Sequence, residues 1–230
     1  MIAGQSIGVI IPALNEELSI GSVLEALPAA FDTVVVVDNG SADATARIAA
    51  SKGALVVHEK QRGYGAACLR GIAEFAKNPP EIVLFMDADA SDHPDDALHV
   101  ATEVASGACD FCIGSRSRGN HERGSLTPVQ RFGNWLSTTL MRWIWKAPYT
   151  DLGPLRAIRY TTLVSMAMED RTWGWTIEMQ IKAAMHRIRT VEIPVRYRVR
   201  IGSSKISGTV MGSVKAGTKI IATIAKYALR

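Results

Sequence analysis

The stretch Ile82-Val83-Leu84-Phe85-Met86-Asp87-Ala88-Asp89 decides how the rest of this chain is interpreted. Five consecutive apolar residues are typical of a strand that is buried on both faces of a sheet. The run ends in two carboxylates one residue apart, which places both at the rim of that sheet, where they repel each other. A divalent cation prefers hard oxygen ligands, relieves this repulsion and can bridge to a diphosphate. An isolated Asp-x-Asp is more often an ordinary polar loop, so the neighbouring segments must decide.

Strands and helices alternate along the first half of the chain. Apolar runs predict strands at residues 7–11, 33–37, 54–57 and 82–86. Helical patterns lie between them, which predicts right-handed crossovers and an α/β fold with a mostly parallel central sheet and flanking helices. Polar clusters follow three of the strands, at residues 12–16, 38–41 and 87–89. Ligands of open α/β sheets bind beyond the carboxyl ends of the strands, so we expect the three clusters to face one crevice.

The charges divide unevenly between the two halves of the chain. Residues 1–110 carry 6 Lys and Arg against 16 Asp and Glu, whereas residues 111–230 carry 20 against 6. The acidic half suits a metal site, and the basic half suits phosphates, nucleic acid or an anionic membrane surface. With 230 residues, of which 47% are hydrophobic, the chain is long enough to bury one full core.

Cysteine content and hydropathy indicate a cytoplasmic protein, soluble or peripheral on a membrane. Three cysteines exclude a disulfide framework, and Cys109 and Cys112 lack two obvious further ligands for structural zinc. We therefore expect these thiols to be buried and inert. The N-terminus has no signal-peptide pattern, and no uncharged apolar run reaches the ~18 residues of a membrane span.

Seven stretches of the sequence resemble the family 2 glycosyltransferases, and most closely the dolichol- or polyprenol-phosphate sugar synthase branch. The matching stretches are residues 9–17, 37–41, 62–66, 86–89, 114–116, 151–156 and 200–205. The resemblance implies a GT-A fold over residues 1–205 that uses a UDP- or GDP-sugar. It also implies an inverting transfer that depends on Mg²⁺ or Mn²⁺, with a polyprenyl (dolichyl or undecaprenyl) phosphate as the acceptor.

The resemblance also assigns roles to residues on the donor side. Asp89 becomes the main protein ligand of the metal, with Ser91 as a weaker ligand and Asp87 as a further candidate. The nucleotide-sugar site is implied to comprise Pro12, Leu14, Glu16, Asp38, Asn39, Arg62, Gly63, Asp87, Ala88 and Lys205. Asn39 departs from the family pattern, because an acidic residue is usual there, and Ser91 stands where the branch often has a better ligand.

The chemistry of the leaving group gives the basic residues a purpose. Sugar transfer releases a nucleoside diphosphate that gains negative charge, and a metal ion with positioned cations stabilises that charge. The catalytic candidates are Asp89, Arg116, Glu178 and Arg200. Those for the acceptor phosphate are Arg116, Gln130, Arg131, Arg156 and Ser204.

The acceptor decides what Glu178 does. A hydroxyl acceptor needs a general base, for which Glu178 is the best carboxylate, whereas a phosphate monoester is already ionised. Glu178 alternatively orients Arg156 or another cation through an ion pair. The many cationic and amide side chains between Arg116 and Arg156 favour an anionic acceptor. Transfer to a soluble or glycolipid hydroxyl remains the alternative.

Residues 129–145 form an amphipathic pattern with two interpretations. Apolar side chains recur at helical spacing at Val129, Phe132, Leu136, Leu140 and Trp143, which ordinarily predicts a helix that faces the core. Tryptophans among Arg131, Arg142 and Lys146 also suit a lipid–water interface.

Residues 206–230 predict an appended basic amphipathic helix. On a helical wheel Lys215, Lys219, Lys226 and Arg230 fall within about 60° of one another. Such a helix suits peripheral contact with an anionic membrane or with a membrane partner protein. An ordinary surface helix packed on the body of the protein is the alternative.

Other functions fit the sequence less well. A sugar nucleotidyltransferase has a glycine-rich loop with arginine after its first strand, where this chain has Pro12-Ala13-Leu14-Asn15-Glu16. A phosphatase with an aspartate nucleophile places its Asp-x-Asp after the first strand rather than the fourth. The acidic half and the absence of a recognition module argue against nucleic acid as a partner. A non-catalytic, donor-binding scaffold stays open.

Overall fold

The computed structural model describes residues 1–202 and 210–229, with the main chain alone for 210–216. Within these residues the protein forms one seven-stranded sheet. The strands are β1 (Ile7–Ala13), β2 (Thr33–Asp38), β3 (Leu55–His58), β4 (Ile82–Phe85), β5 (Phe111–Ser115), β6 (Arg156–Arg159) and β7 (Thr190–Pro194). Their order is β3-β2-β1-β4-β6-β5-β7. The pairs β1–β2, β2–β3, β1–β4 and β5–β7 are parallel, and β6 runs antiparallel to β4 and β5. The predicted mostly parallel sheet is confirmed.

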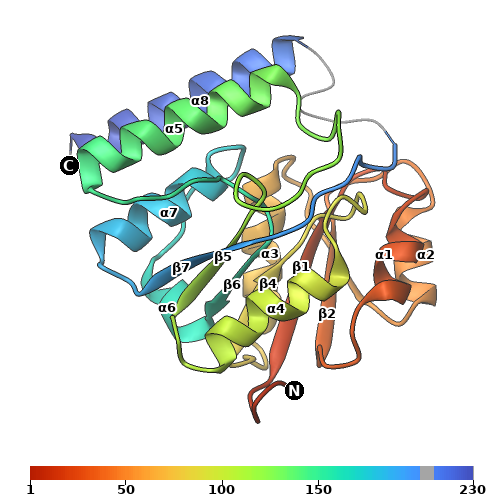
Figure 1. Cartoon of the computed structure of the whole chain (residues 1–230). Coiled ribbons are helices and arrows are strands. Elements are labelled where there is room, and N and C mark those ends of the chain that lie inside the picture. The colour runs from red at the N-terminus through yellow and green to blue at the C-terminus, as the bar shows by residue number, and fades with distance from the viewer. Residues whose placement is uncertain (203–209, 230) are drawn as a thin grey trace.

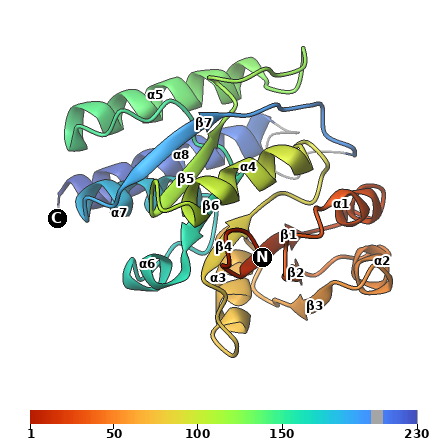
Figure 2. The same cartoon turned by 60° about the horizontal axis from the view of Figure 1, so that its bottom comes forward.

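Helices cover both faces of this sheet (Figures 1 and 2). Alternate residues of β1 and β4 enter opposite cores, as the two-residue period of a strand requires. One core packs against α1 (Ile20–Ala26), α2 (Thr45–Ser51) and α4 (Pro94–Ala105). The other core packs against α3 (Tyr64–Phe75), α5 (Pro128–Trp145), α6 (Tyr160–Ser165), α7 (Trp175–Met185) and α8 (Val210–Ala228).

The loops after β1 and β2 are hydrogen-bonded to each other. The Asn15 amide donates to the Ser41 hydroxyl at 2.9 Å, and the Glu16 amide donates to the Thr45 hydroxyl at 2.8 Å. In return, the Asn15 side chain accepts from the Ala42 amide at 2.7 Å. These bonds fix the two loops beside each other at the carboxyl ends of adjacent strands, so two of the three predicted polar clusters do meet.

Helices α5 and α8 lie side by side across one side of the molecule (Figure 1). On α8, Thr223, Ile224 and Tyr227 are buried, while Lys219 and Lys226 form ion pairs at 2.8 Å with Asp170 and Glu169. The described part of α8 is therefore packed against the body of the protein. Lys205 and Arg230 lie outside the described residues, and the Lys215 side chain is not described. Within the described chain, no helix is long and apolar enough to span a bilayer.

The prediction that the apolar stripe of α5 faces the core is wrong for Val129, Phe132 and Trp143, although Leu140 packs against the core. Val129, Phe132, Trp135 and Trp143 are between 57% and 73% exposed. The buried residues of α5 are Ser137, Thr138 and Met141. Hydroxyls can be buried here because each donates to a carbonyl of its own helix, Ser137 to Gly133 at 2.7 Å and Thr138 to Asn134 at 3.0 Å.

The start of α3 depends on close contact between two backbones. The Gly65 amide donates to the Thr172 carbonyl at 3.1 Å, and the Ala66 amide donates to the Arg171 carbonyl at 2.9 Å. A Cβ at Gly65 would lie 2.1 Å from the Asp170 carbonyl oxygen, so only glycine permits this approach.

Substitution of Gly65 tests this contact. We expect Gly65→Ala to lower the free energy of unfolding by about 1–3 kcal/mol, because the added methyl group must displace backbone. Gly133→Ala is the matched control, since a Cβ there meets no atom within 4 Å. That variant should gain about 0.5–1 kcal/mol through helix propensity. Urea unfolding measures both, and equal effects would contradict the proposed contact.

Candidate active site

Three aspartates crowd the end of β4. Asp89 is 3% exposed, and its Oδ1 accepts from the Ser91 amide at 2.9 Å and from the Ser91 hydroxyl at 2.5 Å. Asp92 is 1% exposed; its Oδ2 accepts from the Asp87 amide at 3.3 Å, and its Oδ1 has no hydrogen-bond partner among the described residues. The sequence therefore buries negative charge at this point, and buried charge requires cations.

Burial and the neighbouring charges raise the pKa values of two of these aspartates. Burial, and after it the charge of Asp89, raise the pKa of Asp87 to about 7, although Arg200 and Arg116 oppose the rise. Burial and the charges of Asp87 and Asp89 hold the pKa of Asp92 well above its usual range. Mutual repulsion at a strand end, expected from the spacing of Asp87 and Asp89, is thus present in the structure.

Arg200 supplies a cation to this cluster. Its guanidinium lies 2.8 Å from Oδ2 of Asp89 and 3.5 Å from Oε1 of Glu16. Glu16 follows β1 and Asp89 follows β4, so one arginine joins two of the predicted polar clusters. Main-chain bonds hold this segment in place, because the Ile201 amide donates to the Asp89 carbonyl at 2.9 Å and the Arg198 amide to that of Ser91 at 3.0 Å.

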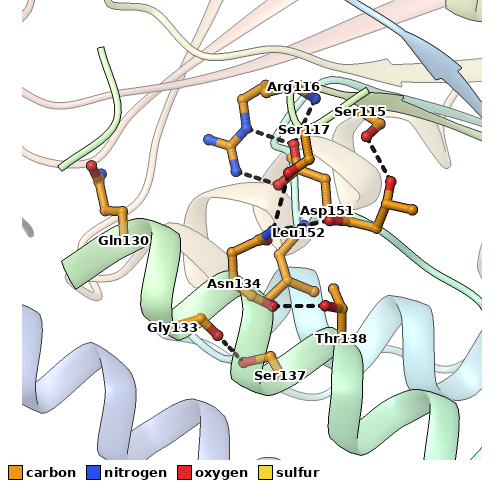
Figure 3. A network of polar contacts seen from close by, with 12 residues as sticks. Ser115, Arg116, Ser117, Gln130, Gly133, Asn134, Ser137, Thr138, Asp151 and Leu152 are labelled. Atoms are coloured by element: carbon orange, nitrogen blue, oxygen red, sulfur yellow. Dashed lines mark hydrogen bonds and ion pairs between the residues drawn. The ribbon is translucent and has the colours of Figure 1, made fainter. Parts of the chain in front are cut away.

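Arg116 faces the same aspartates from the end of β5. Its side chain forms a two-pronged contact with Asp151, with both N···O distances at 2.8 Å (Figure 3). Burial opposes ionisation of Asp151, but the charge and hydrogen bonds of Arg116 outweigh it and keep the pKa of Asp151 below its usual range. The Arg116 guanidinium also lies 5.0 Å from the centre of the Tyr197 ring. Tyr197 in turn pairs with Asp92, and the charge of Arg116 lowers the pKa values of both Asp87 and Asp92.

The loops after β2 and β3 are hydrogen-bonded to each other. Asp38 is 5% exposed and accepts from the Ser41 amide at 2.9 Å. Asn39 accepts from the Gly63 amide at 2.7 Å and donates to the Gln61 carbonyl at 2.8 Å. Asn39 thereby holds the segment that contains Arg62, and the Arg62 guanidinium lies over Gly40. Pro12 is within β1 and pairs with Val37, while Leu14 follows that strand and is half-buried.

Glu178 lies in a separate cluster beneath α8. Its carboxylate accepts from the Asp170 amide at 2.7 Å and from the Tyr227 hydroxyl at 2.7 Å, and it pairs with Lys182 at 2.9 Å. It is 1% exposed. The structure therefore places Glu178 in an ion pair with a cation, which is Lys182 rather than Arg156. Its role as a general base stays a prediction without a described contact to the aspartates.

The residues predicted for an acceptor phosphate differ in their surroundings. Gln130 caps α5, since its side chain accepts from the Thr127 amide at 2.8 Å, and Arg131 on the same helix is exposed. Arg156 is 1% exposed and donates to the main-chain carbonyls of Gly153 and Thr176. Its Nε has no described partner, and burial lowers its pKa. Ser204, together with Lys205 on the donor side, lies outside the described residues.

The aspartates fit a divalent cation only as part of its coordination shell. In the described part of the chain, no three His, Cys, Asp or Glu side chains converge on one point. Asp87 and Asp89 nevertheless repel each other, and Asp92 has an unpartnered oxygen nearby. One or two carboxylates completed by diphosphate oxygens and water are a usual shell for Mg²⁺.

Cys109 and Cys112 are buried, as expected.

Sequence reasoning missed several residues that shape this site. Asn134 donates to the Thr150 carbonyl at 3.0 Å and accepts from the Leu152 amide at 2.8 Å, so it fastens α5 to the segment that contains Asp151 (Figure 3). Glu192 accepts from the Thr150 amide and hydroxyl. Tyr197 lies over Arg116, and burial raises its pKa to about 12. These contacts join residues distant in sequence, so no local pattern indicated them.

Comparison with known proteins identifies the family. The family model for "Glycosyl transferase family 2" matches residues 8–166. An uncharacterized glycosyltransferase of Mycobacterium tuberculosis is 37% identical over 217 residues, covering 94% of this chain and 96% of its own length. A dolichyl-phosphate hexose transferase of Haloferax volcanii is 29% identical, covering 97% and 96%.

Among solved structures, a glucosyl-3-phosphoglycerate synthase of Mycobacterium tuberculosis, crystallised with Mn²⁺, UDP and glucosyl-3-phosphoglycerate, has a TM-score of 0.78. It is 21% identical, and the match covers 98% of this chain and 81% of that one. This likeness confirms the GT-A type of α/β fold that the sequence predicted. With the family model over most of the chain, it leads to one conclusion: this protein is an enzyme of glycosyltransferase family 2.

Proposed function

We propose that the protein transfers a sugar, with inversion, from a UDP- or GDP-sugar to a polyprenyl phosphate at the cytoplasmic face of a membrane. The observation that carries this proposal is the 2.8 Å contact between Arg200 and Asp89 after β4, with Arg116 beside the ring of Tyr197, which pairs with Asp92. Carboxylates that hold a cation, with arginines opposite them, suit a diphosphate leaving group. Asp38 at the end of β2 and Arg62 after β3 suit the nucleoside, since the two strands are adjacent.

A divalent cation completes this arrangement. Asp89 would hold it, with Asp87 as a second ligand, and the bound ion would stabilise the charge of the departing diphosphate. Arg200 would then exchange its contact with Asp89 for the diphosphate. Ser91 donates to Asp89, so it orients the carboxylate whether or not it touches the ion. The structural neighbour with Mn²⁺ and UDP supports Mn²⁺ as the first ion to try.

The acceptor is inferred from charge and from the contacts of Glu178 in the described part of the chain. The carboxylate of Glu178 is engaged by Lys182, Tyr227 and two backbone amides, so it is not arranged to deprotonate a hydroxyl. A phosphate monoester needs no such base. Two hydrogen bonds from Asp151 fix the orientation of the Arg116 guanidinium, which suits an anionic acceptor. The dolichyl-phosphate hexose transferase among the relatives supports the same acceptor class.

Substitution of Asp89 tests the donor chemistry. We expect wild-type protein with Mn²⁺ to release UDP or GDP from one sugar nucleotide of a panel and to form an extractable prenyl-phosphate sugar. Asp89→Asn should lower that rate by about 10²–10³, because the metal loses its main ligand. Asp95→Asn is the control, since that carboxylate is 79% exposed and lies on α4.

Three results of the same assay would contradict the proposal. Transfer to phosphoglycerate or to a sugar hydroxyl, with none to a prenyl phosphate, would replace the acceptor. Donor binding without metal-stimulated release of nucleotide would indicate a scaffold. An Asp89→Asn variant as active as wild type would show that the metal site lies elsewhere.

Arg200 and the metal should compete for Asp89. We expect Arg200→Ala to raise the affinity for Mn²⁺ alone by about tenfold, because a charge-assisted contact is removed from the carboxylate. The same variant should bind UDP in the presence of Mn²⁺ more weakly than wild type. Arg196→Ala is the control, because Arg196 pairs with Asp96 instead. Electron paramagnetic resonance of free Mn²⁺ measures the metal affinity, and equilibrium dialysis of UDP measures the nucleotide affinity. An unchanged Mn²⁺ affinity would contradict the exchange.

The raised pKa of Asp87 predicts a pH-dependent stability. In metal-free buffer the folded protein holds a proton on Asp87 up to about pH 7, whereas the unfolded chain releases it near pH 4. Stability from this group is therefore fully present below about pH 4 and is lost progressively as the pH rises to about 7. We expect Asp87→Asn to raise the melting temperature at pH 8 and to give little gain at pH 4. An equal gain at both pH values would contradict the assignment.

A further inference from the structure

The outer face of α5 is as apolar as the interior of a protein, but it is exposed to solvent. We define this face by Val129, Phe132, Trp135 and Trp143, whose residue exposures are 57%, 60%, 59% and 73%. At 100° per residue the four positions fall within an arc of about 120°. The opposite side of the helix is the buried one. Large contiguous apolar patches on a folded surface mark interaction sites.

We propose that the outer face of α5 docks onto the surface of an anionic phospholipid bilayer. Tryptophan prefers the boundary between headgroups and hydrocarbon, where its ring is apolar and its N–H stays hydrated. A helix that lies in the membrane plane combines such residues with cations at the border of its apolar face. Arg131 and Arg142 are both exposed and adjoin the same edge of the arc.

Charge selects the bilayer over a second copy of this chain. The 18 residues of α5 include two arginines and no Asp or Glu. A twofold contact places the same surface on both partners, so it would bring these arginines together without a carboxylate on α5 to offset them. An anionic lipid surface attracts the same arginines instead.

The helix that carries the proposed surface is hydrogen-bonded to two segments of the candidate active site. Asn134, one turn along α5 from Arg131, bonds to the Ser117 hydroxyl at 3.3 Å and to the Leu152 amide at 2.8 Å. Ser117 follows Arg116, and Leu152 follows Asp151 (Figure 3). A prenyl phosphate held by Arg116 would therefore enter from the side on which α5 meets the lipid. This part of the inference rests on the proposed function, whereas docking itself does not.

Vesicle binding tests the inference. We expect the full chain to bind vesicles of phosphatidylcholine with phosphatidylglycerol, and brominated lipids should quench its tryptophan fluorescence. Trp135→Gln and Trp143→Gln should each weaken binding by about tenfold. Arg131→Gln and Arg142→Gln should each weaken it by about fivefold on anionic vesicles and leave binding to pure phosphatidylcholine unchanged. All four positions are exposed, so melting temperatures should stay at the wild-type value.

The control is Val164→Gln, a 51% exposed residue on α6, which lies apart from α5 (Figure 1). It should bind vesicles as wild type does. Wild-type affinity in the Trp135→Gln and Trp143→Gln variants would overturn the inference. The inference would also be overturned if the protein does not bind vesicles and instead forms a dimer that depends on Trp143.

A transfer assay separates this inference from the proposed function. With a short, water-soluble prenyl phosphate and no vesicles, the tryptophan variants should transfer sugar as fast as wild type. With a long-chain prenyl phosphate in vesicles they should be slow. If wild type uses no prenyl phosphate at all, the proposed function fails while the vesicle result still decides the docking surface.

Discussion

Buried negative charge at the end of β4 is the constraint on which the rest of the site depends. Asp87, Asp89 and Asp92 cannot all be ionised side by side without cations, and the raised pKa values of Asp87 and Asp92 express this cost. The basic second half of the chain supplies the cations from several elements. Arg116 follows β5 and Arg200 follows β7. The fold therefore brings cations from the second half of the chain to the carboxylates of the first half.

Much of this arrangement could be predicted from the sequence, because its causes are local. An apolar run that ends in polar residues indicates a buried strand and its rim, so the parallel strands and the meeting of residues 12–16, 38–41 and 87–89 were predictable. The antiparallel β6 was not, since Arg156–Arg159 is a short strand with an arginine at each end. The surroundings of Glu178 depend on α7 and α8 meeting, which no spacing along the chain encodes.

Helices α5 and α8 show how hydrophobic periodicity alone can mislead. Both have an apolar stripe, and the period places the stripe on one side of the helix without saying which side faces the protein. On α5 the buried side consists of Ser137, Thr138 and Met141, because hydroxyls satisfied within their own helix can pack closely. On α8 two of the predicted surface lysines are tied to Glu169 and Asp170. In both helices the neighbouring elements determine which side is buried.

The segment 169–172 joins two parts of the molecule that are far apart in sequence. Its carbonyls press against Gly63 and Gly65 at the start of α3, while its carboxylates hold Lys219 and Lys226 of α8. A shift in this segment would move the residue beside Arg62 and loosen α8 together. Gly63 and Gly65 should therefore vary together in evolution with Lys219 and Lys226. Related proteins that lack the two glycines should also differ at the two lysines.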